Sequence, residues 1–356
     1  MPTLALAPKA PLQQLANICQ TEGTIDLAER LRGLDAWLRD DVAQVAQTLQ
    51  DLRGGTRLVE TAAVDLVTTR GKYLRPICVA LASRTGRGFT PAAHQLAVAV
   101  EMVHNATLLH DDVVDFAETR RGKPTARALY GNAASIFAGD WLLVNALMRV
   151  QASGVDGALP LMLSIIEEMV LAESLQLERR GKLDDDALST HSYLAVARGK
   201  TAALFRWAMI AGARAGGVNV EIENALENFG LHLGVAFQVI DDCLDFAGSE
   251  TAIGKKPLAD LREGKVTYPL IIAARQSPAI VDNLREFLST PETDQAAGSL
   301  MLHIAQLVKS SGALEAANGF ATAQIESAIA TLGHLHECEA KDQLRTVAYA
   351  SLARSH

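Results

Sequence analysis

Residues 100–116, VEMVHNATLLHDDVVDF, hold the pattern that decides both the fold and the chemistry of this chain. Residues 229–246, FGLHLGVAFQVIDDCLDF, repeat its ending, so D-D-x-x-D follows an apolar, helix-patterned run in two places. An α-helix turns once per 3.6 residues, so the first and fifth residues of each motif share a face. Carboxylates gathered on apolar helices repel one another and lose hydration unless a cation lies between them. Hard oxygen ligands of this kind indicate Mg²⁺, with substrate phosphates completing its coordination shell.

The composition of the 356 residues is globular, with 49% hydrophobic and 21% charged residues. The formal net charge of −8 argues against a general nucleic-acid binder. The four cysteines are scattered and form no C-x-x-C pair, so we expect reduced thiols and a cytoplasmic protein. No apolar run reaches the roughly 18 residues that a membrane span needs. Peripheral membrane contact during product release stays open.

Apolar residues three and four positions apart predict helices along nearly the whole chain. The predicted helical segments are 92–115, 133–152, 158–180, 190–214, 221–247 and 265–276. We expect Thr90 to cap one helix and Pro91 to begin it. The stretch 289–299 is the clearest flexible connector, and it is expected to join two helices of one domain. The predicted organisation is a peripheral segment, 1–30, followed by a single all-α domain, 31–356.

Basic segments lie near both aspartate motifs. They are RGKYLRP (70–76), FAETRRGKPTAR (116–127), GKT (199–201) and GKKPLADLREGKVTYP (254–269). Alone, each is an ordinary basic loop, and the arginines after the first motif could simply neutralise it. Together with the two acidic walls they predict a cavity for more than one diphosphate and several Mg²⁺ ions. Its apolar lining favours ionisation of an allylic diphosphate to a carbocation protected from water.

The order and spacing of these motifs resemble those of the trans-isoprenyl diphosphate synthases, the polyprenyl synthetase family. The likeness runs from about residue 71 to residue 265. The stretch HNATLLHDDVVDFAETRRGKPTA (104–126) is most similar to long-chain members that make octaprenyl to decaprenyl chains for quinones. The resemblance implies an isoprenoid-synthase-type helical bundle around a deep central cavity, a homodimer, and about three Mg²⁺ ions per active site. The implied reaction condenses isopentenyl diphosphate repeatedly with an allylic diphosphate.

The same resemblance implies roles for individual residues. The principal Mg²⁺ ligands would be Asp111, Asp115 and Asp241, and waters or ligands would be oriented by Asp112, Asp242 and Asp245. The allylic diphosphate would be bound by Arg120, Lys200, Thr201, Gln238, Lys255 and Lys265. Isopentenyl diphosphate would be bound by Lys72, Arg75, His104 and Arg121. The small residues Ala106 and Thr107, one turn before the first motif, would let a growing chain pass.

Four alternatives differ in chain length or in class. A farnesyl or geranylgeranyl diphosphate synthase differs only in product. A terpene cyclase usually replaces the second D-D-x-x-D and needs no isopentenyl diphosphate site. A non-catalytic subunit of a heteromeric synthase usually has lost aspartates, and here all six are present. A helical scaffold protein would leave the clustered charges unexplained.

Overall fold

The computed structural model describes residues 11–21, 23–52, 57–67, 73–120, 122–247, 257–291 and 295–353. In these residues the fold is almost entirely helical, and the described strands are limited to a hairpin of β1 (Thr119–Arg120) and β2 (Lys123–Pro124). The first helices are α1 (Pro11–Thr21), α2 (Ile25–Gln50), α3 (Leu58–Val67), α4 (Leu74–Arg84), α5 (Pro91–Val114) and α6 (Ala126–Tyr130). They are followed by α7 (Asn132–Ala152), α8 (Ala158–Arg179), α9 (Thr190–Ala197), the π-helical segment η1 (Arg198–Ala202), α10 (Ala203–Gly216) and α11 (Val220–Ala247). The last are α13 (Ala259–Arg262), α14 (Tyr268–Gln276), α15 (Pro278–Ser289), α16 (Gln295–Ser310), α17 (Ala313–Thr331), the 3₁₀ turn η2 (Leu332–His334) and α18 (Glu339–Leu352).

The predicted all-α fold is confirmed, and the long helices lie within a few residues of the predicted segments. Helix α5 begins as its sequence indicates, because Thr90 Oγ1 accepts a hydrogen bond from the backbone N–H of Ala93 and Pro91 occupies the first turn. The predicted boundary between residues 30 and 31 falls inside the continuous helix α2. Helix α1 packs on α2, and buried residues of both, among them Leu12 and Leu31, belong to the main hydrophobic core.

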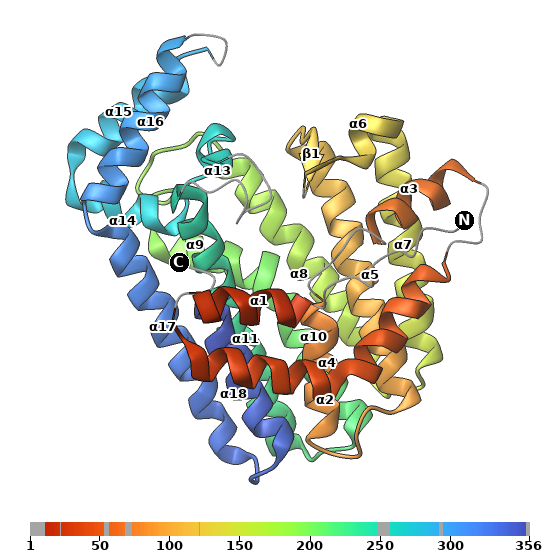
Figure 1. The fold of residues 1–356 in the computed structure, drawn as a ribbon. Coiled ribbons are helices and arrows are strands. Elements are labelled where there is room, and N and C mark those ends of the chain that lie inside the picture. Colours follow the sequence, from red (N-terminus) through yellow and green to blue (C-terminus); the bar gives the residue numbers. More distant parts are fainter. Residues whose placement is uncertain are drawn as a thin grey trace, which may run out of the picture.

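The aspartate motifs end two helices of the bundle. Helices α10 and α11 pack against each other, α10 also packs on α4 and α5, and α7 runs along α5 (Figure 1). The hairpin after α5 and the short helix α13 after α11 lie at the same end of the bundle, at the top of Figure 1. A second, smaller hydrophobic cluster joins α14, α15 and α16, and α15 and α16 project from the bundle in the same view. The fold therefore brings both acidic segments to one end of a packed helical core.

A π-helical turn interrupts the helical run formed by α9, η1 and α10. Glycines permit close packing there, since a Cβ atom on Gly199 would lie 2.6 Å from Ala172 Cβ and one on Gly234 would lie 2.4 Å from Ala202 Cα. Only glycine allows backbones to approach this closely. Single π turns in helices are frequent at functional sites, and this one carries Lys200 and Thr201.

Helix α7 is long and apolar enough to span a membrane, and it is the one such helix among the described helices. The sequence-based expectation of no spanning segment did not identify it. Composition alone is weak evidence, because a packed helix of a globular core passes the same test. Within the fold, α7 packs along α5 and buries Ala138, Leu142 and Ala146 in the main core.

Candidate active site

The first aspartate motif spans the end of α5. Asp111 and Asp112 belong to the last helical turn, and Asp115 is the residue that follows the helix. Burial raises the pKa of Asp111; the neighbouring carboxylates Glu173 and Asp115 add to this, and Lys200 and Arg120 oppose it. The predicted crowding of negative charge on one helix end is therefore present in the structure.

Asp112 is completely buried and pairs with Arg120 of the hairpin. Both Nε and Nη2 of Arg120 lie 2.8 Å from Asp112 Oδ1. Burial raises the pKa of Asp112, and Arg120 opposes that shift. The other oxygen, Oδ2, is buried without a hydrogen-bond partner among the described residues. Arg120 thus pairs with one oxygen of Asp112, and the other oxygen remains for a further ligand.

Asp115 is contacted by two cations from distant parts of the chain. Arg180 Nη2 lies 2.5 Å from Oδ1, and Lys265 Nζ lies 3.1 Å from Oδ2. Lys265 also lies 2.5 Å from Glu263 Oε2. Burial acts to raise the pKa of Asp115, but Lys265, Lys200 and Arg180 outweigh it and the pKa is lowered. Asp115 is therefore held as a carboxylate, as a metal ligand must be.

In the second motif, hydrogen bonds occupy both oxygens of the buried Asp242. Gln238 Nε2 donates to Oδ1 over 2.8 Å, while the Tyr193 hydroxyl donates to Oδ2 over 2.7 Å and the Tyr268 backbone N–H over 3.4 Å. Burial raises the pKa of Asp242 to about 7, and Asp260 adds to the shift. Asp242 is thus suited to orienting its neighbours, while the preceding Asp241 is half-buried on α11.

Asp245 is fully buried and joins α11 to α13. Its carboxylate accepts hydrogen bonds from the backbone N–H groups of Ala259 at 3.1 Å and Asp260 at 3.0 Å. Leu258 has φ of 59°, a left-handed conformation that non-glycine residues rarely adopt. This turn directs the first amides of α13 at Asp245. The geometry makes Asp245 an anchor for the segment that leads to Lys265.

Two side chains of the π turn, those of Lys200 and Thr201, make contacts with different helices. Lys200 Nζ lies 2.5 Å from Glu173 Oε1 and 2.9 Å from Gln176 Oε1, both on α8. Thr201 donates its hydroxyl hydrogen to Gln238 Oε1, and Gln238 in turn donates to Asp242. Gln238, which lies three residues before the second motif, therefore contacts that motif directly.

Arg75 enters the site from α4. Its guanidinium lies over the Phe205 ring, 4.5 Å from the centroid, and its buried Nε has no hydrogen-bond partner among the described residues. Burial lowers the pKa of Arg75, and Glu101 and Asp241 oppose that shift. Asn105 Nδ2 donates to the backbone oxygen of Glu101 over 2.7 Å. A half-buried cation whose charge acts on Glu101 and Asp241 can bind a second diphosphate.

The remaining predicted residues lie along α5 or outside the described chain. His104 is half-buried, and its backbone oxygen accepts a hydrogen bond from Thr107 Oγ1 over 2.8 Å. Ala106 is 1% exposed within the main core. Predicted site residues that lie outside the described residues are Lys72, Arg121 and Lys255, together with the unassigned Lys256.

No three His, Cys, Asp or Glu side chains in the described parts of the chain form a cluster that could by itself hold a metal ion. The aspartates face Arg120, Arg180 and Lys265 instead. The donor set still fits Mg²⁺, because it supplies carboxylate oxygens, among them the buried Asp112 Oδ2, which has no hydrogen-bond partner within the described part of the chain. Such a site suits an ion that completes its coordination with substrate oxygens.

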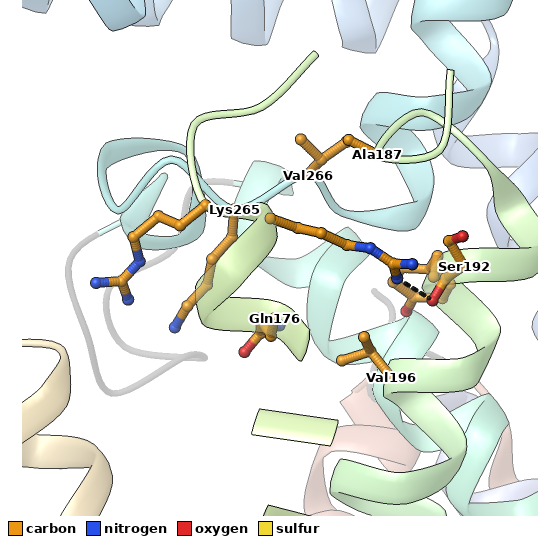
Figure 2. A pocket seen from close by; sticks show the side chains of 9 residues that line it. Gln176, Ala187, Ser192, Val196, Lys265 and Val266 are labelled. Atoms are coloured by element: carbon orange, nitrogen blue, oxygen red, sulfur yellow. Dashed lines mark hydrogen bonds between the residues drawn. The ribbon is translucent and has the colours of Figure 1, made fainter. Parts of the chain in front are cut away.

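A shallow, partly open pocket is lined by Arg180 and Lys265, the two cations on Asp115, and its empty space of about 400 Å³ includes open solvent (Figure 2). It is lined from α8, from α9 and from the turn before α14, with Gln176, Ser192, Val196 and Lys265 labelled in Figure 2. Tyr193 and Arg180 also line it, so it is continuous with the contacts of both aspartate motifs. The pocket therefore combines basic side chains with apolar ones.

Sequence reasoning missed four polar residues of this site, namely Glu173, Gln176, Arg180 and Tyr193. Each contacts a predicted residue from another helix or from the turn after α8. One signal was available, since the segment LERRGK places two arginines before a glycine at the end of an apolar helix. The others become recognisable only once α8, α9 and α11 are packed together.

Comparison with known proteins identifies the family of this chain. Residues 56–304 match the sequence profile of the polyprenyl synthetase family. The chain is 33% identical to octaprenyl diphosphate synthase of Escherichia coli (strain K12), covering 88% of this chain and 96% of that protein. It is 32% identical to heptaprenyl diphosphate synthase component 2 of Geobacillus stearothermophilus, covering 90% and 97% respectively.

The fold also resembles solved structures of this family. A polyprenyl synthase from Caulobacter crescentus CB15, crystallised with calcium and isoprenyl diphosphate, superposes with a TM-score of 0.83 at 34% identity. That alignment covers 91% of this chain and 97% of the other. The chain therefore belongs to the polyprenyl synthetase family and is a prenyltransferase that makes prenyl diphosphates.

Proposed function

We propose that this protein condenses isopentenyl diphosphate repeatedly with an allylic diphosphate, giving an all-trans octaprenyl to decaprenyl diphosphate for quinone side chains. The observation that carries the proposal is that two aspartate motifs and cations from four segments are gathered at one end of an apolar bundle. Arg120, Lys200 and Lys265 accompany the first motif, and Arg75 faces the second. The two groups of cations suit the two diphosphates of the substrates, and the apolar bundle suits their hydrocarbon chains.

Mg²⁺ is the metal that the donor set favours, and the family resemblance suggests about three ions per site. Asp111, Asp115 and Asp241 would hold them, with Asp112, Asp242 and Asp245 orienting these ligands. Bound Mg²⁺ would stabilise charge on the departing diphosphate as a Lewis acid. A relative of known structure was crystallised in complex with calcium and isoprenyl diphosphate, which supports a divalent cation and a prenyl diphosphate as ligands here.

Side chains of this protein would bind the two diphosphates and exclude water. Lys200, released from Glu173 and Gln176, can donate to the allylic diphosphate from the π turn. Arg75 can donate to isopentenyl diphosphate, because its Nε lacks a partner among the described residues. Buried apolar side chains around Phe205 exclude water from the carbocation. The diphosphate that leaves can accept the final proton, so no side-chain base is required.

A long product is favoured over farnesyl or geranylgeranyl diphosphate. Ala106 and Thr107 are small and lie one turn below Asp111, so no aromatic ring blocks this wall. The relatives named as octaprenyl and heptaprenyl diphosphate synthases support the same preference. Long apolar products also favour a cytoplasmic enzyme that touches the membrane surface when it releases them.

We also propose a homodimer that buries an apolar face of α7 and α8. Large apolar side chains on this face are exposed in the single chain, including Phe137 (59%), Met148 (65%) and Leu171 (64%). A second copy is the occupant that the resemblance implies. Phe137→Glu should give a monomer in light scattering coupled to size-exclusion chromatography. Leu302→Glu, at an exposed position on α16, should remain dimeric.

The proposal is tested by measuring turnover with both substrates and Mg²⁺. Asp111→Ala and Asp241→Ala should each lower turnover by roughly 10²-fold or more, as loss of one preorganised stabiliser typically does. Asp282→Ala, on the exposed surface of α15, is the control and should retain wild-type turnover. Undiminished turnover in excess chelator would exclude the metal-dependent mechanism.

A further inference from the structure

Two turns of the chain are joined beside Asp115. Gly181, the second residue after α8, donates its backbone N–H to the backbone oxygen of Gly264 over 2.9 Å. Both glycines have positive φ, 73° and 71°, which other residues adopt only with strain. The residues next to them are Arg180 and Lys265, the two cations on Asp115. The hydrogen bond therefore fixes the backbones from which two cations reach one carboxylate.

The two cations differ in what else they contact. Lys265 has a second carboxylate partner, Glu263, at 2.5 Å. The Arg180 side chain forms its ion pair and hydrogen bond with Asp115 alone among the described residues. The Arg180 side chain is 27% exposed and lines the pocket beside the first motif. A divalent cation on Asp115 would displace Arg180 and leave its guanidinium at the mouth of this pocket.

We propose that Arg180 is an additional diphosphate-binding residue that exchanges Asp115 for the substrate diphosphate when a divalent cation takes that carboxylate. This inference rests on the proposed function, which supplies the cation and the diphosphate. A guanidinium matches a diphosphate well, because its planar fork can donate two parallel hydrogen bonds to phosphate oxygens. The Gly181–Gly264 hydrogen bond keeps the backbone in place, so the exchange needs only a side-chain movement.

The neighbouring Arg179 provides a matched control. Its Nη2 lies 2.6 Å from Asp186, and its Nη1 donates to the backbone oxygen of Ser192 over 3.1 Å, the bond dashed in Figure 2. Arg179 lines the same pocket but makes its described contacts away from Asp115. Replacing it removes the same charge from an adjacent position without changing the partner of Asp115.

Two binding measurements test the exchange. Binding of Mn²⁺ alone is followed by electron paramagnetic resonance of the free ion, and binding of inorganic pyrophosphate in excess Mg²⁺ is followed by calorimetry. For Arg180→Gln we expect Mn²⁺ to bind about 3-fold more tightly and pyrophosphate about 10-fold more weakly. Arg180→Lys should recover part of the pyrophosphate affinity, and Arg179→Gln should match the wild type in both measurements.

Opposite outcomes separate the inference from the proposed function. If the wild type binds pyrophosphate and Arg180→Gln binds both ligands as the wild type does, the role of Arg180 is wrong and the proposed function stands. Equal losses of pyrophosphate affinity in Arg179→Gln and Arg180→Gln would also overturn the role of Arg180. The effect would then follow from the loss of one positive charge near the pocket and not from the position of Arg180. A wild type that binds no pyrophosphate with Mg²⁺ overturns both.

Discussion

The phenol of Tyr193 lies 2.7 Å from Asp242 Oδ2 and donates a hydrogen bond to it. Burial raises the pKa of Tyr193 well above its ordinary value, and Asp242 adds to the shift, so the phenol stays a donor. The Tyr193 ring packs against Tyr268, whose ring stacks on Phe320 at a centroid distance of 4.8 Å. This aromatic column fixes the second aspartate motif to α9, α14 and α17.

Tyr193→Phe should lower kcat by roughly 10-fold, because loss of a partner that orients a metal-binding motif typically costs 10-fold to 100-fold. The ring and its packing are retained, so the thermal midpoint should change little. Tyr268→Phe is the control, since Tyr268 contacts Asp242 through its backbone N–H, which phenylalanine keeps. Equal kcat values for Tyr193→Phe and the wild type would show that the hydroxyl does not position Asp242.

Asp242 should give the protein a pH-dependent stability in excess chelator. Its pKa in the folded protein is about 7, against an ordinary value of 3.8. The folded chain therefore keeps a proton that the unfolded chain releases, so this contribution to stability is full below about pH 4 and is lost as the pH rises through 7. Asp242→Asn should make the urea midpoint of unfolding less dependent on pH between pH 5 and pH 7.5. An equally steep pH dependence in the variant would contradict this assignment.

Arg75→Ala and Lys200→Ala should affect different substrates. Arg75 comes from α4 and faces the second motif, whereas Lys200 comes from the π turn and acts on Asp111. We expect Arg75→Ala to raise KM for isopentenyl diphosphate by roughly 10-fold, and Lys200→Ala to act on the allylic substrate. Steady-state kinetics with each substrate varied in turn measure this. An unchanged KM for isopentenyl diphosphate in Arg75→Ala would show that the division is wrong.

Ala106→Phe should shorten the product. The new ring would lie on the apolar wall of α5, below Asp111, so the first condensation should survive and later ones should stop. We expect farnesyl or geranylgeranyl diphosphate, with a destabilisation of about 1–3 kcal/mol from overpacking. Ala106→Leu adds less volume and should give intermediate lengths. An active Ala106→Phe variant that still makes the wild-type product would place the growing chain along another wall.

Local pattern was enough to predict most helices and the contacts within one helix. The 3.6-residue period gave the bounds of α5 and α11 within a few residues, and the contact between Gln238 and Asp242 lies within one turn of α11. The Thr90 cap was predicted for the same reason, because capping depends on residues three apart. Such features follow from neighbours in sequence.

Contacts between distant segments could not be predicted in this way. The pairing of Arg180 and Lys265 with Asp115 depends on a hydrogen bond between two glycine turns far apart in the sequence. The π turn also has no periodic signature; α8 packs closely on it at Gly199, and α11 packs closely on it through Gly234. Asp245 has the same spacing as Asp115 yet binds backbone amides, a difference that only the fold reveals.

The central claim is most directly tested by the products of the wild-type protein. Purified protein is incubated with Mg²⁺, an allylic primer and excess isopentenyl diphosphate, and the dephosphorylated products are separated by reversed-phase chromatography against polyprenol standards. We predict octaprenyl to decaprenyl chains as the major products, with none formed in excess chelator. A product distribution that stops at farnesyl or geranylgeranyl length, or condensation that continues without a divalent cation, would contradict the account.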